Sequence, residues 1–198
     1  MSILKQKYSF ALLVLSAVFL YLSTTIIISN TSGQSPMISN NAGARNNGLT
    51  QSIQSYKDNL TSIFGDPLFE ETSHRRTGSI VIKNQEHNQT RDSYIASGIL
   101  KGVGKVLDNG TFITTELGKG YSTSKGTGVL STSDGYNATY LGMDVGTAES
   151  SGIETYKGLQ IFNANPDSKL AYLNNVIGIY LYRSWPNGTS SGTVWEWK

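Results

Sequence analysis

Closely spaced turn signals constrain the fold of this chain more than any other feature of its sequence. From Gly78 onward Thr, Val, Ile and Tyr are abundant, and short turn sequences interrupt them at Asp108–Gly110, Asp134–Gly135 and Asn187–Gly188. Asp-Gly and Asn-Gly pairs are typical of the tight turns that join antiparallel strands, so we assign Asp108 and Asp134 to turns. The pattern predicts an all-β domain built from hairpins.

Glycines inside the expected strands favour a barrel over a sandwich. The expected strands are Ser79–Lys83, Asp92–Val106, Thr111–Leu117, Gly120–Ser124, Thr127–Thr132, Ala138–Met143, Gly152–Asn163, Val176–Arg183 and Gly192–Lys198, and the glycines within them include Gly98, Gly102, Gly104, Gly142, Gly158 and Gly178. Glycine weakens a flat strand but permits the coiling that closes a small barrel. We therefore predict a small antiparallel β-barrel of about eight strands over residues 66–198. One short helix is expected near Pro166–Leu173, with Asn165 as its N-cap and with Leu170 and Leu173 packed inward.

An uncharged apolar segment near the N-terminus predicts membrane targeting. Residues Tyr8–Ile28 carry no charge and follow Lys5 and Lys7. At about 1.5 Å per residue, a helix of this length spans the ~30 Å apolar core of a bilayer. A cleavable signal peptide usually has a shorter apolar region and a small-residue cleavage site. The pattern favours an uncleaved anchor over residues 1–28, with a cleaved signal as the alternative. In both cases the lysines stay inside and the rest of the chain is exported.

Residues 29–48 and 49–65 differ sharply in pattern. The first stretch is rich in Asn, Ser, Gly and Ala, which predicts a flexible linker. In the second, apolar residues recur at helical spacing, namely Leu49, Ile53, Tyr56, Leu60 and Ile63. They predict an amphipathic helix over Thr50–Phe64 with Gly65 as its C-cap. Its apolar stripe either docks on the barrel or forms a short oligomeric stalk. A homo-oligomer is therefore one of the alternatives. Both faces of the expected strand Val176–Arg183 are apolar, and the helix or a second subunit is expected to cover the outer one.

Residue counts exclude several classes of function. The chain has no cysteine and two histidines, which excludes disulfides, thiolate metal sites and a histidine-rich metal centre. Lys5 and Lys7 account for the whole net charge of +2, so the exported part is neutral and offers no basic surface to nucleic acid. The Gly-x-Gly pairs lack the third glycine of a dinucleotide-binding fingerprint, and no cofactor is expected. His74 and His87 fall in polar stretches, where we expect solvated loops.

Carboxylates within the expected strands are the first candidate site residues. Glu116, Glu154 and Glu196 each fall within an expected strand rather than in a turn. Two of them pointing into one lumen would form an acid–base or cation-binding pair. Pointing outward, they would be ordinary surface charges, and the alternation of side chains along a strand leaves both directions open.

Aromatic residues are the second group of candidates. Strand tyrosines are numerous, and Tyr140, Tyr156 and Tyr180 are the ones we place in a lumen. Tyrosine suits a cavity for a carbohydrate or another small molecule, because its ring offers an apolar face and its hydroxyl a hydrogen bond. The same residues also serve as ordinary strand and core residues.

Asn-x-Ser/Thr sequences offer candidate glycosylation sites. They occur at Asn30, Asn59, Asn88, Asn109, Asn137 and Asn187. Several fall in expected loops of an exported chain, where glycosylation is physically accessible. We expect at least one of them to be used if the host has the machinery.

A series of short motifs follows in order along the C-terminal half. They are Gly118–Gly120, Gly126–Leu130, Asp134–Gly135, Leu170–Gly178 and Trp195–Lys198. In this order they resemble a group of exported proteins found mainly in ammonia-oxidising archaea, over Gly98–Lys198. That group has no assigned activity, so the resemblance implies no catalytic residue. In architecture, the glycine-rich hairpins are also similar to the small barrels of allene oxide cyclase and dirigent proteins, and no functional residue of those families has a counterpart here.

Taken together, these features favour a membrane-tethered or secreted cell-surface barrel that binds a ligand or an envelope component and is not an enzyme. One alternative is a barrel enzyme of the cyclase or isomerase kind, which requires a lumen with converging polar groups. The other is a structural envelope or assembly protein, which predicts a lumen filled by its own side chains.

Overall fold

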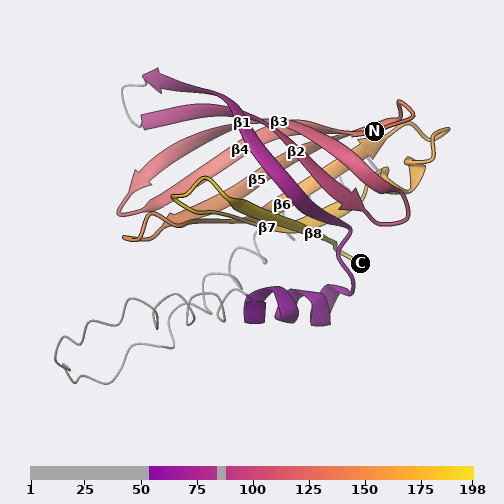
Figure 1. Cartoon of the computed structure of the whole chain (residues 1–198), viewed down its shortest axis with the longest axis horizontal. Coiled ribbons are helices and arrows are strands. Elements are labelled where there is room, and N and C mark those ends of the chain that lie inside the picture. Colours follow the sequence, from indigo (N-terminus) through magenta and orange to yellow (C-terminus); the bar gives the residue numbers. More distant parts are fainter. Residues whose placement is uncertain (1–53, 84–87) are drawn as a thin grey trace, which may run out of the picture. The chain divides into compact units, whose positions relative to one another are not determined.

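Eight antiparallel strands close into a barrel in the computed structural model of the chain, which describes residues 54–83 and 88–198 (Figure 1). The strands are β1 (Phe69–Lys83), β2 (Asn88–Leu100), β3 (Gly104–Gly118), β4 (Tyr121–Thr132), β5 (Asn137–Ala148), β6 (Glu154–Ala164), β7 (Ile177–Ser184) and β8 (Ser190–Glu196). Each strand pairs with the next along the chain, and β8 returns to β1. The prediction of an antiparallel barrel of about eight strands is therefore confirmed. The expected membrane segment 1–28, the linker 29–48, Asn30 and His87 lie outside the described residues.

Asp108–Gly110 lies in the middle of β3, so its assignment to a turn is wrong. The turn that separates β2 from β3 comes earlier, at residues 101–103, where Gly102 has a φ of 76°. This turn divides the segment that we expected to be one strand, Asp92–Val106. Asp134–Gly135 and Asn187–Gly188 do form turns, between β4 and β5 and between β7 and β8.

Glycines that face the lumen make room for aromatic rings. Six inward aromatic residues lie directly opposite a glycine on the neighbouring strand, in the pairs Tyr94–Gly110, Phe112–Gly126, Tyr140–Gly128, Tyr156–Gly146, Tyr180–Gly158 and Tyr182–Gly192. A Cβ atom added at Gly110 would lie 2.5 Å from the ring of Tyr94. Asn109-Gly110 is therefore a strand sequence whose glycine provides space rather than a turn. Two glycines of β4, Gly126 and Gly128, leave space for rings in the same way. The expected strands Gly120–Ser124 and Thr127–Thr132 are parts of this one continuous strand.

The pairing of β1 with β8, which closes the barrel, is short. It consists of Phe69 opposite Val194 and Glu70 opposite Thr193, whereas β1 pairs with β2 along nearly its whole length. Two register shifts, between Glu71 and Ser73 and between Arg76 and Gly78, bend β1 in this region. Away from this closing pairing, β1 and β2 diverge from the other strands of the barrel (Figure 1).

Apolar side chains fill one end of the barrel. They include Leu100, Val106, Leu130, Phe162, Leu170 and Leu173, all of them buried. The expected helix near Pro166–Leu173 is shorter than predicted, since only Ala171–Leu173 forms a 3-10 turn. Asn165 does accept a hydrogen bond from the Asp167 N–H at 2.9 Å, and the inward packing of Leu170 and Leu173 is confirmed. This segment closes the end at which the chain enters and leaves the barrel.

The described part of the amphipathic helix, residues 54–64, contacts the outside of the barrel. The Trp195 Nε1–H donates to Thr61 Oγ1 at 3.2 Å, and the Lys57 ammonium lies 2.6 Å from a Glu70 oxygen. Lys157 also lies over the ring of Tyr56, 4.3 Å from its centroid. The helix ends as expected, with Gly65 at a φ of 83° and its N–H bonded to the Thr61 carbonyl. These contacts agree with docking of the helix on its own barrel.

Strand β7 is covered on both faces, as its apolar pattern indicates. Tyr180 and Leu181 point to opposite faces of the sheet, and both are buried. No helix within residues 54–83 and 88–198 is long and apolar enough to cross a bilayer.

Candidate functional site

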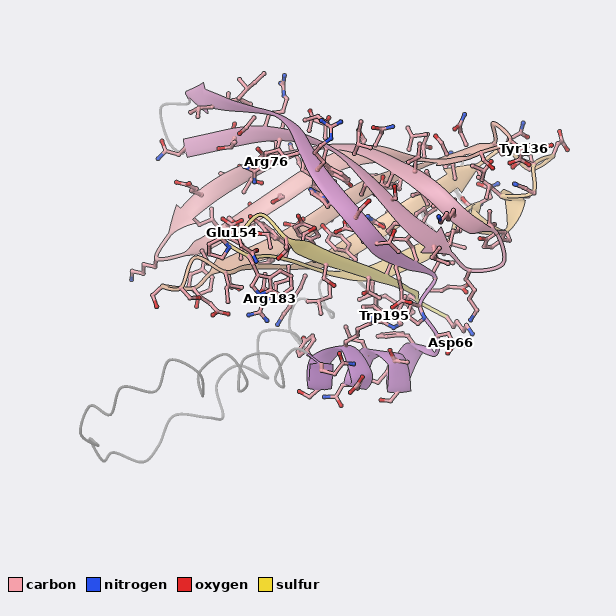
Figure 2. The ribbon with its side chains drawn as sticks, viewed as in Figure 1. Asp66, Arg76, Tyr136, Glu154, Arg183 and Trp195 are labelled. Carbon is pink, nitrogen blue, oxygen red and sulfur yellow. The ribbon has the colours of Figure 1, made fainter. Side chains whose placement is uncertain are left out.

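The half of the barrel away from the apolar end contains a cavity of about 140 Å³. Aromatic and acidic side chains line it, among them Tyr94, Asp108, Asp144, Tyr156, Tyr180 and Tyr182. Its lining runs from buried Asp108 to Arg76, whose side chain is 64% exposed. Figure 2 places Arg76 and Glu154 toward the end of the barrel opposite Tyr136, which lies in the β4–β5 turn. The barrel is therefore plugged by apolar residues at one end and hollow and polar toward the other.

A triangle of hydroxyl and carboxyl groups lies deep in the barrel. The Tyr140 hydroxyl lies 2.9 and 3.1 Å from the two Asp108 oxygens, and the Tyr94 hydroxyl lies 3.2 Å from Asp108 and 2.5 Å from the Tyr140 hydroxyl. Two phenol protons can serve only two of these three contacts, so all three are hydrogen bonds only when Asp108 carries a proton. Burial raises the pKa of Asp108 to about 6, although the bonds from Tyr140 and Tyr94 stabilise its carboxylate and act in the opposite direction. Burial also raises the pKa of Tyr94 and Tyr140 well above the ordinary value, so both stay neutral donors.

Replacing Asp108 by asparagine is expected to stabilise the protein at pH 7 and to leave it unchanged at pH 4. An Asp pKa of about 6 in the folded state exceeds the value of about 3.9 in an unfolded chain. The folded state therefore binds this proton more tightly, and its contribution to stability is complete below about pH 4 and lost as the pH rises through about 6. From this difference between the folded and unfolded pKa values, Asp108→Asn should have a free energy of unfolding about 2–3 kcal/mol higher than that of the native chain at pH 7.

Urea unfolding of both chains at pH 4, 5.5 and 7 measures this gain. Asp134→Asn is the control, because Asp134 is exposed and pairs with Lys169 in a surface turn. A difference between Asp108→Asn and the native chain that stays constant from pH 4 to 7 would contradict the raised pKa of Asp108.

Asp144 is a second buried carboxyl group in the cavity wall. It is 6% exposed, and one of its oxygens, Oδ2, accepts a hydrogen bond from the Tyr180 hydroxyl. The other oxygen, Oδ1, is buried and accepts no hydrogen bond of standard geometry from the described residues. Burial raises the pKa of Asp144, and the bond from Tyr180 and the nearby hydroxyl and backbone N–H of Ser124 oppose that rise. A buried carboxylate oxygen without a donor is costly, so the cavity offers a strong acceptor to whatever enters it.

Glu71 and His74 of β1 bridge toward β7 and β8, beyond the point where the strand pairing ends. Glu71 accepts a hydrogen bond from the Ser190 hydroxyl at 2.6 Å and lies 3.2 Å from His74 Nδ1. His74 Nε2 lies 3.4 Å from the Tyr182 hydroxyl, and its ring stacks on Tyr94 at 4.8 Å. The interpretation of His74 as a solvated loop histidine is therefore wrong, because β1 begins ten residues earlier than Ser79 and carries His74 to the lumen.

Two further acidic groups lie nearer the open end of the cavity. Glu154 accepts hydrogen bonds from the hydroxyl groups of Tyr156 and Ser184, both at 3.2 Å. Asp92 lies 3.6 Å from Arg76 Nε in a partly exposed ion pair. Burial raises the pKa of Tyr156, and it raises that of Tyr182 to about 12, so both phenols remain protonated donors.

The structure brings only some of the predicted site residues together. Glu154, Tyr156 and Tyr180 line the cavity, and Tyr140 belongs to the triangle around Asp108. Glu116 is exposed near the end of β3. Glu196 is half-buried and lies with Tyr172 in a shallow surface pocket near the C-terminus. A shared pair among the three glutamates is not formed.

The residues that sequence reasoning missed are Asp108, Asp144 and His74. Asp144 alternates with Tyr140 and Gly142 on β5, and every second residue of that strand is buried. The alternation of side chains along a strand can be read from the sequence. With Tyr140 assigned to the lumen, it also assigns Asp144 to the lumen, because the two residues are four apart. The candidate glycosylation residues Asn59, Asn88, Asn109, Asn137 and Asn187 are all exposed.

The described residues do not converge as a metal site would require, since no group of three His, Asp or Glu side chains is suitably arranged among them. Comparisons of the chain with protein-family models, with curated proteins and with solved structures gave no match. The arrangement of the cavity is thus the basis on which a function can be assigned.

Proposed function

We propose that this protein is a binding protein that holds a small polar ligand inside its barrel. The observation that carries the proposal is the buried Asp144 Oδ1, an acceptor in the wall of an internal cavity to which no residue among 54–83 and 88–198 donates a hydrogen bond of standard geometry. Buried polar atoms are nearly always hydrogen-bonded in folded proteins. A ligand that donates a hydrogen bond to this oxygen would remove the cost of leaving it unpaired.

The size of the cavity limits the ligand to a compact small molecule. A volume of about 140 Å³ is close to that of an engineered cavity which binds benzene. Tyrosine rings supply flat apolar contact area, and the surrounding hydroxyl and carboxyl groups fix orientation. This combination supports recognition of a compact molecule rather than a polymer.

The position of the barrel in the cell is part of the same proposal. The charge-free segment Tyr8–Ile28 following Lys5 and Lys7 supports display of the barrel outside the membrane, tethered or secreted. In that setting the protein would capture its ligand from the surroundings of the cell. Several exposed Asn-x-Ser/Thr sites are compatible with this location.

A cavity-filling substitution with a matched control tests the binding function. The full-length chain is screened by thermal shift and calorimetry against small cations, neutral polyols and carboxylic acids of up to about ten heavy atoms. Ser124 faces the cavity and Thr123, next to it on β4, faces outward. Ser124→Phe should abolish binding of any hit, because its ring occupies the cavity, whereas Thr123→Phe should bind like the native chain. Failure of every compound to bind, or retained binding by Ser124→Phe, would refute a lumenal ligand.

One observation favours an enzyme as the second candidate. Asp108, with a pKa of about 6 and two tyrosine hydroxyls in contact, has the properties of a general acid–base group for an isomerase-type proton transfer. Nuclear magnetic resonance of the same compounds, incubated with the native chain, would reveal conversion of a hit into an isomer. Conversion that is lost in Asp108→Asn while binding persists would favour the enzyme, and unchanged compounds would favour the binding protein.

A further inference from the structure

The lumen carries a large excess of negative groups. Five carboxyl groups line the cavity, those of Glu71, Asp92, Asp108, Asp144 and Glu154. Against them stands one guanidinium, that of Arg76, together with the imidazole of His74. Arg76 is mostly exposed and lies against Asp92 at the outer end. Among the described residues, the deep carboxyl groups Asp108 and Asp144 therefore have no Arg or Lys side chain beside them, and His74 is the basic group nearest to Asp108.

The hydrogen bonds of these carboxyl groups confirm the imbalance. Asp108, Asp144 and Glu154 are contacted by hydroxyl groups of tyrosine and serine, which carry no charge. No ion pair with Arg or Lys is formed by these three within the described residues. Buried carboxylates are normally paired with a positive partner or a metal, because desolvating an isolated charge is costly. Within the part of the chain that the structure describes, these three carboxyl groups thus have no Arg or Lys partner.

Aromatic rings surround the same space. Tyr94, Tyr156, Tyr180, Tyr182 and Phe112 line the cavity together with the carboxyl groups. The faces of such rings carry negative electrostatic potential and attract cations within about 6 Å, most strongly where water is excluded. Carboxylates combined with several aromatic rings in the lining favour an organic ammonium group over a neutral polyol, and they repel an anion.

We propose that the lumen binds a compact organic cation, an ammonium group bearing small alkyl substituents, with Asp144 as its principal counter-charge. This inference rests on the proposed binding function and names the chemical class of its ligand. An ammonium N–H donates to the free Asp144 Oδ1, and in a quaternary ammonium the positive methyl groups lie against that oxygen and the tyrosine faces. The absence of three convergent metal-ligating side chains among the described residues favours an organic cation over a metal ion.

Three probes of equal shape and different charge test the proposal. Choline, 3,3-dimethyl-1-butanol and 3,3-dimethylbutanoate share a trimethyl-substituted head and carry charges of +1, 0 and −1 near neutral pH. Calorimetry with the full-length chain at pH 7.5 should give choline an affinity at least about tenfold above that of the alcohol, because only choline gains the Coulomb and cation–π attraction. The carboxylate should bind least. Methylammonium and tetramethylammonium extend the series to smaller cations.

Substitutions at two aspartates separate charge from structure. Asp144→Asn keeps the shape of the side chain and removes its charge, so it should weaken ammonium binding about tenfold or more while leaving the alcohol unaffected. Asp134→Asn removes an exposed carboxylate of the β4–β5 turn and should change the affinity for neither the ammonium compound nor the alcohol. A merely structural role of Asp144 would instead weaken the two probes alike.

The outcomes distinguish this inference from the proposed function. Equal binding of choline and its neutral analogue, or preference for the carboxylate, would overturn the cation assignment and leave a lumenal binding protein. The same conclusion follows if no ammonium compound binds but a sugar or acid of the wider screen does. If nothing in the wider screen binds, the binding function itself fails.

Discussion

Replacing Gly128 by alanine is expected to destabilise the barrel by about 2–3 kcal/mol, a typical cost of inserting a methyl group where no space exists. A Cβ atom at Gly128 would lie 2.2 Å from Cζ and Oη of Tyr140, and this end of the ring is held against Asp108. The ring must move, and its hydroxyl then leaves the Asp108 carboxyl group. Urea unfolding monitored by circular dichroism measures the loss of stability.

Gly78→Ala is the matched control, because Gly78 is also a strand glycine but has nothing within 4 Å of an added Cβ and no positive φ. This variant should be as stable as the native chain or slightly more stable, by about 0.5 kcal/mol. If both glycine variants behaved alike, the close contact between Gly128 and Tyr140 would not be part of the folded protein.

Replacing Trp195 by alanine is expected to cost about 3–5 kcal/mol, the usual range for truncating a buried tryptophan. Trp195 is completely buried although its strand, β8, turns this side chain away from the lumen. Its Nε1–H bonds to Thr61 of the helix 54–64 (Figure 2 labels Trp195 beside this helix). The substitution therefore removes packing between the helix and the barrel as well as the ring itself. Thermal and urea unfolding of the full-length chain provide the measurement.

Trp195→Phe separates the hydrogen bond from the packing. It keeps an aromatic ring, loses the bond to Thr61 Oγ1 and should cost clearly less than the alanine variant. In the alanine variant, limited proteolysis should also cut within residues 54–64 sooner than in the native chain. A fully stable Trp195→Ala with an unchanged cleavage pattern would mean that the helix does not dock through Trp195.

The architecture could be predicted because turn signals and alternation are local features. The Asp-Gly and Asn-Gly pairs at 134–135 and 187–188 form the turns that they indicate, and the capping glycine Gly65 ends its helix. Asp108–Gly110 has the same local signature and lies inside a strand. What distinguishes it is Tyr94 on the neighbouring strand, whose ring occupies the space over Gly110. That requirement is set by a residue distant in sequence, so a local pattern could not reveal it.

The candidate site was predicted in kind but only partly in its members. A tyrosine-lined lumen was expected, and Tyr156 and Tyr180 line the cavity. The acidic residues that matter most were assigned elsewhere, since Asp108 was placed in a turn by its Asn-Gly neighbours. Once the pairing register of the strands is known, the alternation of inward and outward side chains along β3 and β5 places both Asp108 and Asp144 inside the barrel. Register in turn depends on pairing across strands, which a single sequence specifies only through its turns.

The short pairing of β1 with β8 has a consequence for how a ligand would enter and leave. A fully laddered barrel gives way sideways only if many backbone hydrogen bonds break together. Here the strand pairing ends after Glu70, and the contacts that continue across the wall are side-chain bonds, from Ser190 to Glu71 and between His74 and Tyr182. Opening the wall between β1 and β8 beyond Glu70 therefore breaks a few side-chain bonds and no ladder of backbone hydrogen bonds. In the proposed binding protein, the deep carboxyl groups would set the affinity for the ligand, and the weakly joined seam between β1 and β8 would set the rate at which the ligand exchanges.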